Sequence, residues 1–140
     1  MSTRRDDRGS ISIWLATSSF VMLVLVGLAV DLGGQAHAKE RAHDIAAEAA
    51  RAGGEQLQAA PAVEGQFVAV DTAAARQAAQ QYLDAAGVTG TVNITGGSTI
   101  TVRVTDTYDP TFLGAIGINH LTVTAEASAR AVRSLGGTEQ

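Results

Sequence analysis

The sequence contains no cysteine, and only 4% of its residues are aromatic. Without cysteine the chain cannot form a disulfide framework, a thiolate metal site or a cysteine nucleophile, although an exported bacterial domain need not carry disulfides. Few large side chains are available for burial, so any core is thin. The net charge of -4 leaves no basic patch to neutralise phosphates, which argues against nucleic acid as a partner. At 140 residues, one small domain is the most that fits beside the apolar segment near the N-terminus.

That apolar segment is a long run without charge. Between Gly9 and Val30 no side chain is ionisable. At about 1.5 Å of rise per residue, a helix of this length crosses a hydrocarbon core of about 30 Å. We therefore expect a transmembrane helix over residues 11–30.

Basic residues before the span predict its orientation. Arg4, Arg5 and Arg8 flank the apolar run, and acidic residues count little in the positive-inside rule. We expect residues 1–10 in the cytoplasm and residues 31–140 outside, in a single-pass protein of the cell membrane with lipid as its first partner.

The same segment admits a second interpretation, a signal peptide that is removed. The triplet Ala36-His37-Ala38 has the small-x-small form of a cleavage site. However, the apolar run is longer than the roughly 7 to 15 residues usual for a signal peptide, and helix-forming sequence continues through the proposed cut. The anchor is therefore the favoured interpretation.

Residues 31–58 continue the helical pattern and predict an extracytoplasmic stem helix, with alanines on one face and charged side chains on the other. Gly53-Gly54 weakens its last turn, and Pro61 ends it. Six residues, most of them small, form a stripe along which a partner helix could approach closely: Gly27, Gly34, Ala38, Ala42, Ile45 and Ala49. The stripe predicts a helix-docking interface. It equally fits a stem that packs against the protein's own sheet, because a thin sheet needs a cover.

Residues 59–133 predict a small α+β domain, followed by a flexible tail at 134–140. A helix is expected from Asp71 or Thr72 to a stop at Gly87. The residues suited to its inner face are Ala75, Ala78, Ala79, Tyr82 and Ala86.

Alternating polar and β-branched residues predict the sheet of this domain. Two such runs are joined by Gly96-Gly97-Ser98, which is a strong hairpin pattern. Residues 121–132 can add a third antiparallel strand, and residues 112–116 before it are a candidate short apolar helix. One helix covering one face of three antiparallel strands satisfies the burial requirement.

The sequence indicates no catalytic, cofactor or metal site. His37 and His43 are six residues apart, so on a helix they cannot grip one metal ion together. Asp106 and Asp109 are paired carboxylates, but the sequence DTYDP around them is typical of a turn. We therefore expect no enzyme and no cofactor.

Two stretches at the N-terminus carry a family resemblance. The sequence RGSISIWLATSSFVMLVLVGLAVDLGG, followed by AHDIAAEAARAGG, resembles the N-terminal segment of TadE/TadG-like proteins. These are minor, pilin-like membrane components of the Flp/Tad tight-adherence pilus machinery. The resemblance covers roughly residues 8–57. It implies a pilin-like architecture and other pilin-like or pilus-assembly proteins as partners, with homo- or hetero-oligomers formed through the stem helix.

The sequence departs from the processed members of that family at one position. Those members have a glutamate five residues after the cleaved glycine, and counting from Gly9 this place is held by Trp14. The resemblance therefore leans toward the uncleaved, TadG-like branch. Two function classes result: a membrane-anchored pilus-assembly component or minor pilin-like subunit, and a secreted or tethered extracytoplasmic binding domain with a cleaved signal peptide.

Overall fold

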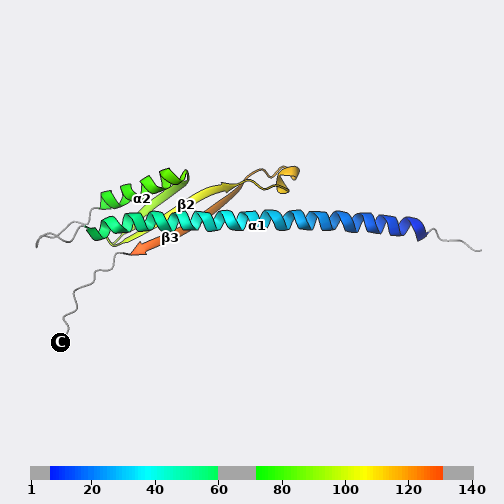
Figure 1. The fold of residues 1–140 in the computed structure, drawn as a ribbon, viewed down its shortest axis with the longest axis horizontal. Coiled ribbons are helices and arrows are strands. Elements are labelled where there is room, and N and C mark those ends of the chain that lie inside the picture. The colour runs from blue at the N-terminus through cyan, green and yellow to red at the C-terminus, as the bar shows by residue number, and fades with distance from the viewer. Residues whose placement is uncertain (1–6, 60–71, 131–140) are drawn as a thin grey trace, which may run out of the picture.

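The computed structural model describes residues 7–59 and 72–130. Their elements follow in the order α1 (Asp7–Ala59), α2 (Thr72–Ala86), β1 (Thr89–Thr95), β2 (Thr99–Tyr108), the 3₁₀ helix η1 (Leu113–Ile116) and β3 (Leu121–Arg130). Helix α1 runs along the whole length of the part that the structure describes, and α2 and the sheet lie beside its C-terminal half (Figure 1). The class is α+β, as the sequence predicts.

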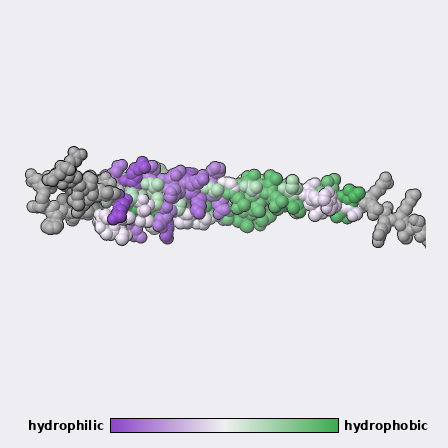
Figure 2. Space-filling view, turned by 90° about the horizontal axis from the view of Figure 1, so that it is seen from below, coloured by the Kyte–Doolittle hydropathy of each residue, from purple (hydrophilic) through white to green (hydrophobic). Residues whose placement is uncertain are grey.

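Helix α1 is continuous over 53 residues, so the expected span and stem are one helix. No proline occurs within it, and alanine, which has the highest helix propensity, is frequent in its C-terminal half. Hydrophobic residues gather on its N-terminal half, and hydrophilic ones lie over the part that contains its C-terminal half (Figure 2). Among the described residues, α1 is the helix that is long and apolar enough to cross a membrane.

The sheet has the strand order β1-β2-β3, and both pairs are antiparallel. The predicted hairpin is confirmed: Gly96 and Gly97 have φ values of 62° and 67°, and the N–H of Ser98 donates to the carbonyl of Thr95 over 3.4 Å. Two consecutive residues with positive φ suit glycine, and such a turn matches the twist of the strands. The third strand is confirmed as well, and it pairs with β2 from Thr99↔Arg130 to Tyr108↔Leu121.

The core lies between one face of the sheet and the two helices. The alternation of the strands turns apolar side chains toward the helices and polar ones toward solvent. The buried hydrophobic cluster consists of Ala42, Ala46, Ala49, Ala50 and Leu57 of α1, Ala75, Ala79 and Leu83 of α2, and Ile100, Val102, Val104 and Ala125 of the sheet. Most of the helical members are alanines, so the helices lie close to the strands.

Three expectations about this core need correction. Two helices, not one, cover the sheet, because the outer half of α1 packs on β2 and β3. On α2 the largest buried side chain is Leu83, whereas Tyr82 is 39% exposed. The Gly53-Gly54 pair does not loosen the end of α1. Both glycines are buried in the helix, and a Cβ at Gly53 would collide with Ile100, so glycine is needed here for close packing.

The division of the chain into a stem (31–58) and a separate domain (59–133) stays a prediction. In the structure, the stem (31–58) and the residues of the expected domain (59–133) share the one hydrophobic cluster. Asp71, Pro61 and the tail at 134–140 lie outside the described residues.

Candidate functional site at the junction of α1 and the β2–β3 connection

The connection between β2 and β3, residues 109–120, runs back along α1 toward its N-terminal half, past the end of the sheet (Figure 1). Two glycines of α1 receive aromatic side chains from this direction. The ring of Tyr108 lies against Gly34, and the ring of Phe112 lies against Gly27. These glycines are seven residues apart, so the contacts span about 10 Å of the helix.

Asp31 lies between these glycines in the sequence and is only 1% exposed. Its Oδ1 accepts hydrogen bonds from the backbone N–H groups of Thr111 at 2.7 Å and Phe112 at 3.2 Å. Its Oδ2 accepts from Phe112 at 2.9 Å and Leu113 at 2.7 Å. One carboxylate of α1 therefore holds three consecutive N–H groups at the start of η1, groups that a short helix leaves without internal partners.

Two opposing effects act on the pKa of Asp31. Desolvation by burial raises this pKa, but the backbone hydrogen bonds from Leu113, Phe112 and Thr111 lower it and together leave the pKa below its ordinary value. The carboxylate is therefore charged at neutral pH. Because both oxygens accept bonds from the connection, we assign Asp31 a structural role, that of a clamp.

The base of the connection is polar and its tip is apolar. Asp109 and His120 meet at the base, with Oδ1 and Nδ1 2.7 Å apart. Between them, residues 110–119 contain no ionisable side chain. The tip leaves apolar side chains in the open: Phe112 is 41% exposed, Ile116 74% and Ile118 42%.

The structure places the predicted docking stripe against the chain itself. Gly27 and Gly34 receive the aromatic rings of the connection, as described above. Ala42 and Ala49 are fully buried in the core, Ile45 packs partly buried against it, and Ala38 is half-buried. This is the arrangement in which the stem covers its own sheet. Docking of a partner helix at the stripe stays a prediction.

The residues expected to orient the membrane span lie at or beyond the start of α1. Arg4 and Arg5 are outside the described residues, and Arg8 belongs to the first turn of the helix. Trp14, at the position of the pilin glutamate, is 70% exposed on the apolar half of α1. The orientation of the span stays a prediction.

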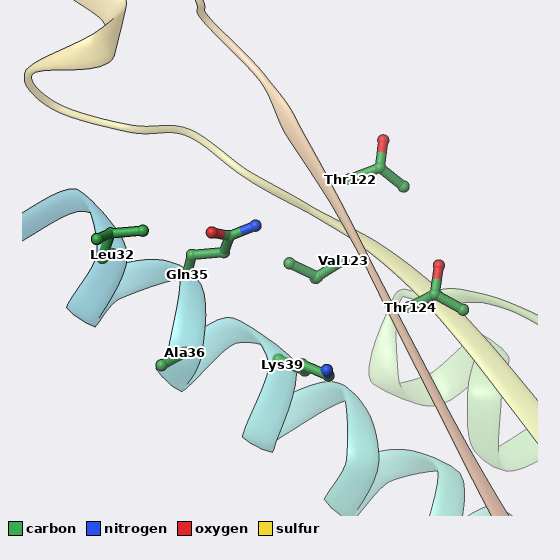
Figure 3. A pocket seen from close by; sticks show the side chains of 7 residues that line it. All are labelled: Leu32, Gln35, Ala36, Lys39, Thr122, Val123 and Thr124. Atoms are coloured by element: carbon green, nitrogen blue, oxygen red, sulfur yellow. The ribbon is translucent and has the colours of Figure 1, made fainter. Parts of the chain in front are cut away.

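A groove lies between α1 and β3, just beyond Asp31 (Figure 3). It holds about 360 Å³ and is lined by Leu32, Gln35, Ala36 and Lys39 of α1 and by Thr122, Val123 and Thr124 of β3. Lys39 is the only ionisable residue in this lining. The groove therefore lacks the acid–base pair or nucleophile with its base that catalysis requires.

Residues considered for catalysis or metal binding are dispersed or engaged locally. His37 pairs with Glu40 at 3.5 Å on the surface of α1, and Oδ1 of Asp106 accepts the N–H of Thr107 at 2.8 Å. Over residues 7–59 and 72–130, no three His, Asp or Glu side chains are grouped so that they could hold a metal ion.

Sequence reasoning missed the role of Asp31, although a signal was present. Asp31 is the first ionisable residue after the long apolar run. A carboxylate is costly to bury unless it is hydrogen-bonded, so an acid at this place suggested a partner in the fold. The partner could not be named, because backbone N–H groups carry no sequence signature.

A comparison with models of protein families gives a match. Residues 9–60 match a family model, Tad, described as Flp pilus-assembly TadE/G-like. This confirms the resemblance inferred from residues 8–57, and the match corresponds closely to helix α1. Neither the search of curated proteins nor that of solved structures finds a match.

Proposed function

Because residues 9–60 match the TadE/G-like pilus-assembly family, we propose that the chain is a membrane-anchored structural component of a Tad-type pilus or a related secretion apparatus. The apolar N-terminal half of α1 anchors the chain in the membrane, with the N-terminus in the cytoplasm. The part of the chain outside the membrane contacts other pilin-like or pilus-assembly proteins. The observation that carries the proposal is the family match over a helix that is apolar in its first half.

The continuity of α1 supports this assignment. The same helix contains the apolar segment and, from Ala42 to Leu57, one wall of the core. Within the described helix, Asp7–Ala59, the apolar segment and the wall of the core are joined without a break. A subunit built in this way presents its outer surface at a defined height and angle to the membrane, which suits assembly into an ordered structure.

The alternative is a domain released by cleavage after Ala38. Such a cut divides α1 and removes Asp31 together with Gly27 and Gly34. The N–H groups held by Asp31 then lose their acceptor, and Tyr108 loses its contact surface. The structure therefore favours the uncut chain.

Fractionation and a fusion test the anchor and its orientation. We expect the full chain in the membrane fraction and a reporter fused after Gln140 to be active only outside the cytoplasm. Cytoplasmic activity of the reporter contradicts the orientation. A soluble product beginning at Lys39 supports the released domain.

Intact mass tests processing at the other end. Since Trp14 stands where processed pilins have glutamate, we expect residues 1–9 to be retained. A mature N-terminus at Ser10 contradicts this and places the chain in the processed branch.

Photo-crosslinking in the native host tests the assembly role. A crosslinking amino acid at His43, an exposed position on the stem part of α1, is expected to capture a pilin-like or pilus-assembly protein, identified by mass spectrometry. The same probe in cells that lack the other pilus-assembly proteins serves as the control and should capture none of them. Absence of capture in cells that assemble the pilus contradicts partner contact at this level of the stem.

A further inference from the structure

We propose that the tip of the β2–β3 connection, residues 110–118, inserts into the outer lipid–water interface beside α1. The outer domain is then held to the membrane at two points, the helix and this loop. The inference rests on the proposed membrane span, because it uses the level of the loop along α1.

The first argument is that the two segments change from apolar to polar at the same level. On α1, the charge of Asp31 is enclosed by backbone N–H groups and does not face the surroundings. The next ionisable residue is His37, which is exposed. On the connection, the first ionisable residue is Asp109, directly after Tyr108, whose ring lies against Gly34. The two changes thus lie within about one helical turn of each other.

The second argument is that the tip lies beside the apolar segment of the helix. Phe112 contacts Gly27, which is three residues inside the expected end of the span at Val30 and seven residues inside Gly34, where the ring of Tyr108 lies. At about 1.5 Å per residue this is a depth of about 5 to 10 Å, typical of interfacial insertion rather than spanning. Tyr108 lies about 10 Å farther out along the helix, near the headgroups, where amphipathic rings are enriched.

The third argument is that the tip satisfies most of its backbone donors without water. Pro110 has no N–H, and the N–H groups of Thr111, Phe112 and Leu113 donate to Asp31. Farther along the tip, the N–H groups of Ala115, Gly117 and Ile118 donate to the carbonyls of Phe112, Gly114 and Leu113, respectively, at 3.0 to 3.1 Å. Non-helical backbone is costly near hydrocarbon unless its polar groups are satisfied internally. By accepting hydrogen bonds from three of these N–H groups, Asp31 lowers the free-energy cost of inserting the loop to a shallow depth.

A lipid surface accounts for these features better than a second copy of the chain. Contact with a second copy would explain exposed apolar side chains only at the contact itself, at Ile116 and Ile118. It would not explain why helix and loop change polarity at the same level. A planar boundary requires helix and loop to change polarity at one level, and this is the arrangement observed. The three exposed apolar side chains of the tip, Phe112, Ile116 and Ile118, supply the buried area that drives interfacial binding.

Because the chain contains no cysteine, single labels test the proposal directly. Full-length I116C is labelled with an environment-sensitive fluorophore and placed in nanodiscs of phosphatidylcholine and phosphatidylglycerol. T124C, at an exposed position on the polar face of the sheet, is the aqueous control. L23C, in the apolar half of α1, reports whether the span itself lies in lipid.

We expect the label at Ile116 to emit at shorter wavelength than that at Thr124, to resist quenching by iodide, and to lose most of its emission when the lipids carry shallow nitroxides. The proposal of loop insertion is overturned if iodide quenches the label at Ile116 as readily as the label at Thr124. If lipid nitroxides still quench the label at Leu23 in that case, the anchor stands. Protection from iodide without quenching by lipid nitroxides means that protein covers the loop, which also overturns the proposal. Absence of lipid quenching at Leu23 overturns the anchor itself and the insertion with it.

Discussion

The ring of Phe112 lies so close to Gly27 that a Cβ added to this glycine would stand 2.5 Å from the ring's Cδ1 atom. The two residues are far apart in the sequence, and their contact fixes the β2–β3 connection on the apolar half of α1. No side chain fits between them unless the ring moves.

Substitution of Gly27 by leucine is therefore expected to displace the connection. We expect a loss of about 1 to 3 kcal/mol in the free energy of unfolding, which is typical of overpacking. The measurement is unfolding in mild detergent, combined with amide exchange over residues 111–118. The matched control is Gly33→Leu, because nothing lies within 4 Å of a Cβ at Gly33. Equal effects of the two substitutions would show that the contact is unimportant.

Substitution of Asp31 by asparagine is expected to release the start of η1. The carboxamide keeps the shape but replaces one acceptor oxygen with a donor that faces N–H groups. We expect the amides of Thr111, Phe112 and Leu113 to exchange roughly tenfold faster or more, since bonds to a charged acceptor are the stronger kind. Asp44→Asn, at an exposed position on α1, is the control and should leave these amides unchanged.

The lowered pKa of Asp31 predicts a pH dependence with a defined sign. A carboxyl group with a lowered pKa in the folded state stabilises that state above its ordinary pKa, here 3.8, and loses this contribution as the pH falls through the lower, folded-state value. Protection of the Thr111–Leu113 amides, corrected for intrinsic exchange rates, should therefore persist at about pH 6 and disappear in strong acid. Asp31→Asn is measured in parallel as the control, because the ionisable pair Asp109–His120 lies on the same connection. A decline of equal size in that variant would show that Asp31 is not its cause.

The core of α2 gives a test of the corrected packing. Leu83 is fully buried and Tyr82 is 39% exposed. Leu83→Ala should cost about 2 to 5 kcal/mol of unfolding free energy through the cavity it leaves. Tyr82→Ala should cost less than about 1 kcal/mol, as at other surface positions. Chemical denaturation of the two variants in parallel measures both losses. A larger loss for Tyr82→Ala than for Leu83→Ala would support the inner face predicted from sequence, which includes Tyr82.

A substitution at Ala49 distinguishes two roles of the stripe, packing in the chain's own core and docking of a partner helix. Ala49→Leu places extra atoms in a fully buried site, so we expect a loss of about 1 to 3 kcal/mol in stability. His43→Leu, at an exposed position on the same helix, should leave stability nearly unchanged. Thermal unfolding followed by circular dichroism measures both. An Ala49→Leu protein that keeps its stability but loses its pilin-like partners would instead establish the stripe as a docking face.

The sequence by itself determined the elements of this protein and their order. The uncharged run from Gly9 to Val30 predicts a long apolar helix because hydrocarbon tolerates few charges. Alternation in the second half predicts the strands because successive side chains point to opposite faces of a sheet. Gly96-Gly97 predicts the hairpin because glycine readily adopts positive φ. The family resemblance also resides in this N-terminal pattern, and its match to residues 9–60 confirms it.

Only the tertiary structure decided what the stripe of small residues contacts, and why Asp31 ends the apolar run. A small residue on a helix permits close approach but does not specify which segment approaches, so Ala42 and Gly34 were compatible with a partner helix or with the chain's own sheet and loop. The partners of Asp31 are backbone N–H groups about 80 residues away, and every residue except proline has such a group. Local pattern determines local conformation, whereas the choice among distant partners depends on how the helices and the sheet pack together.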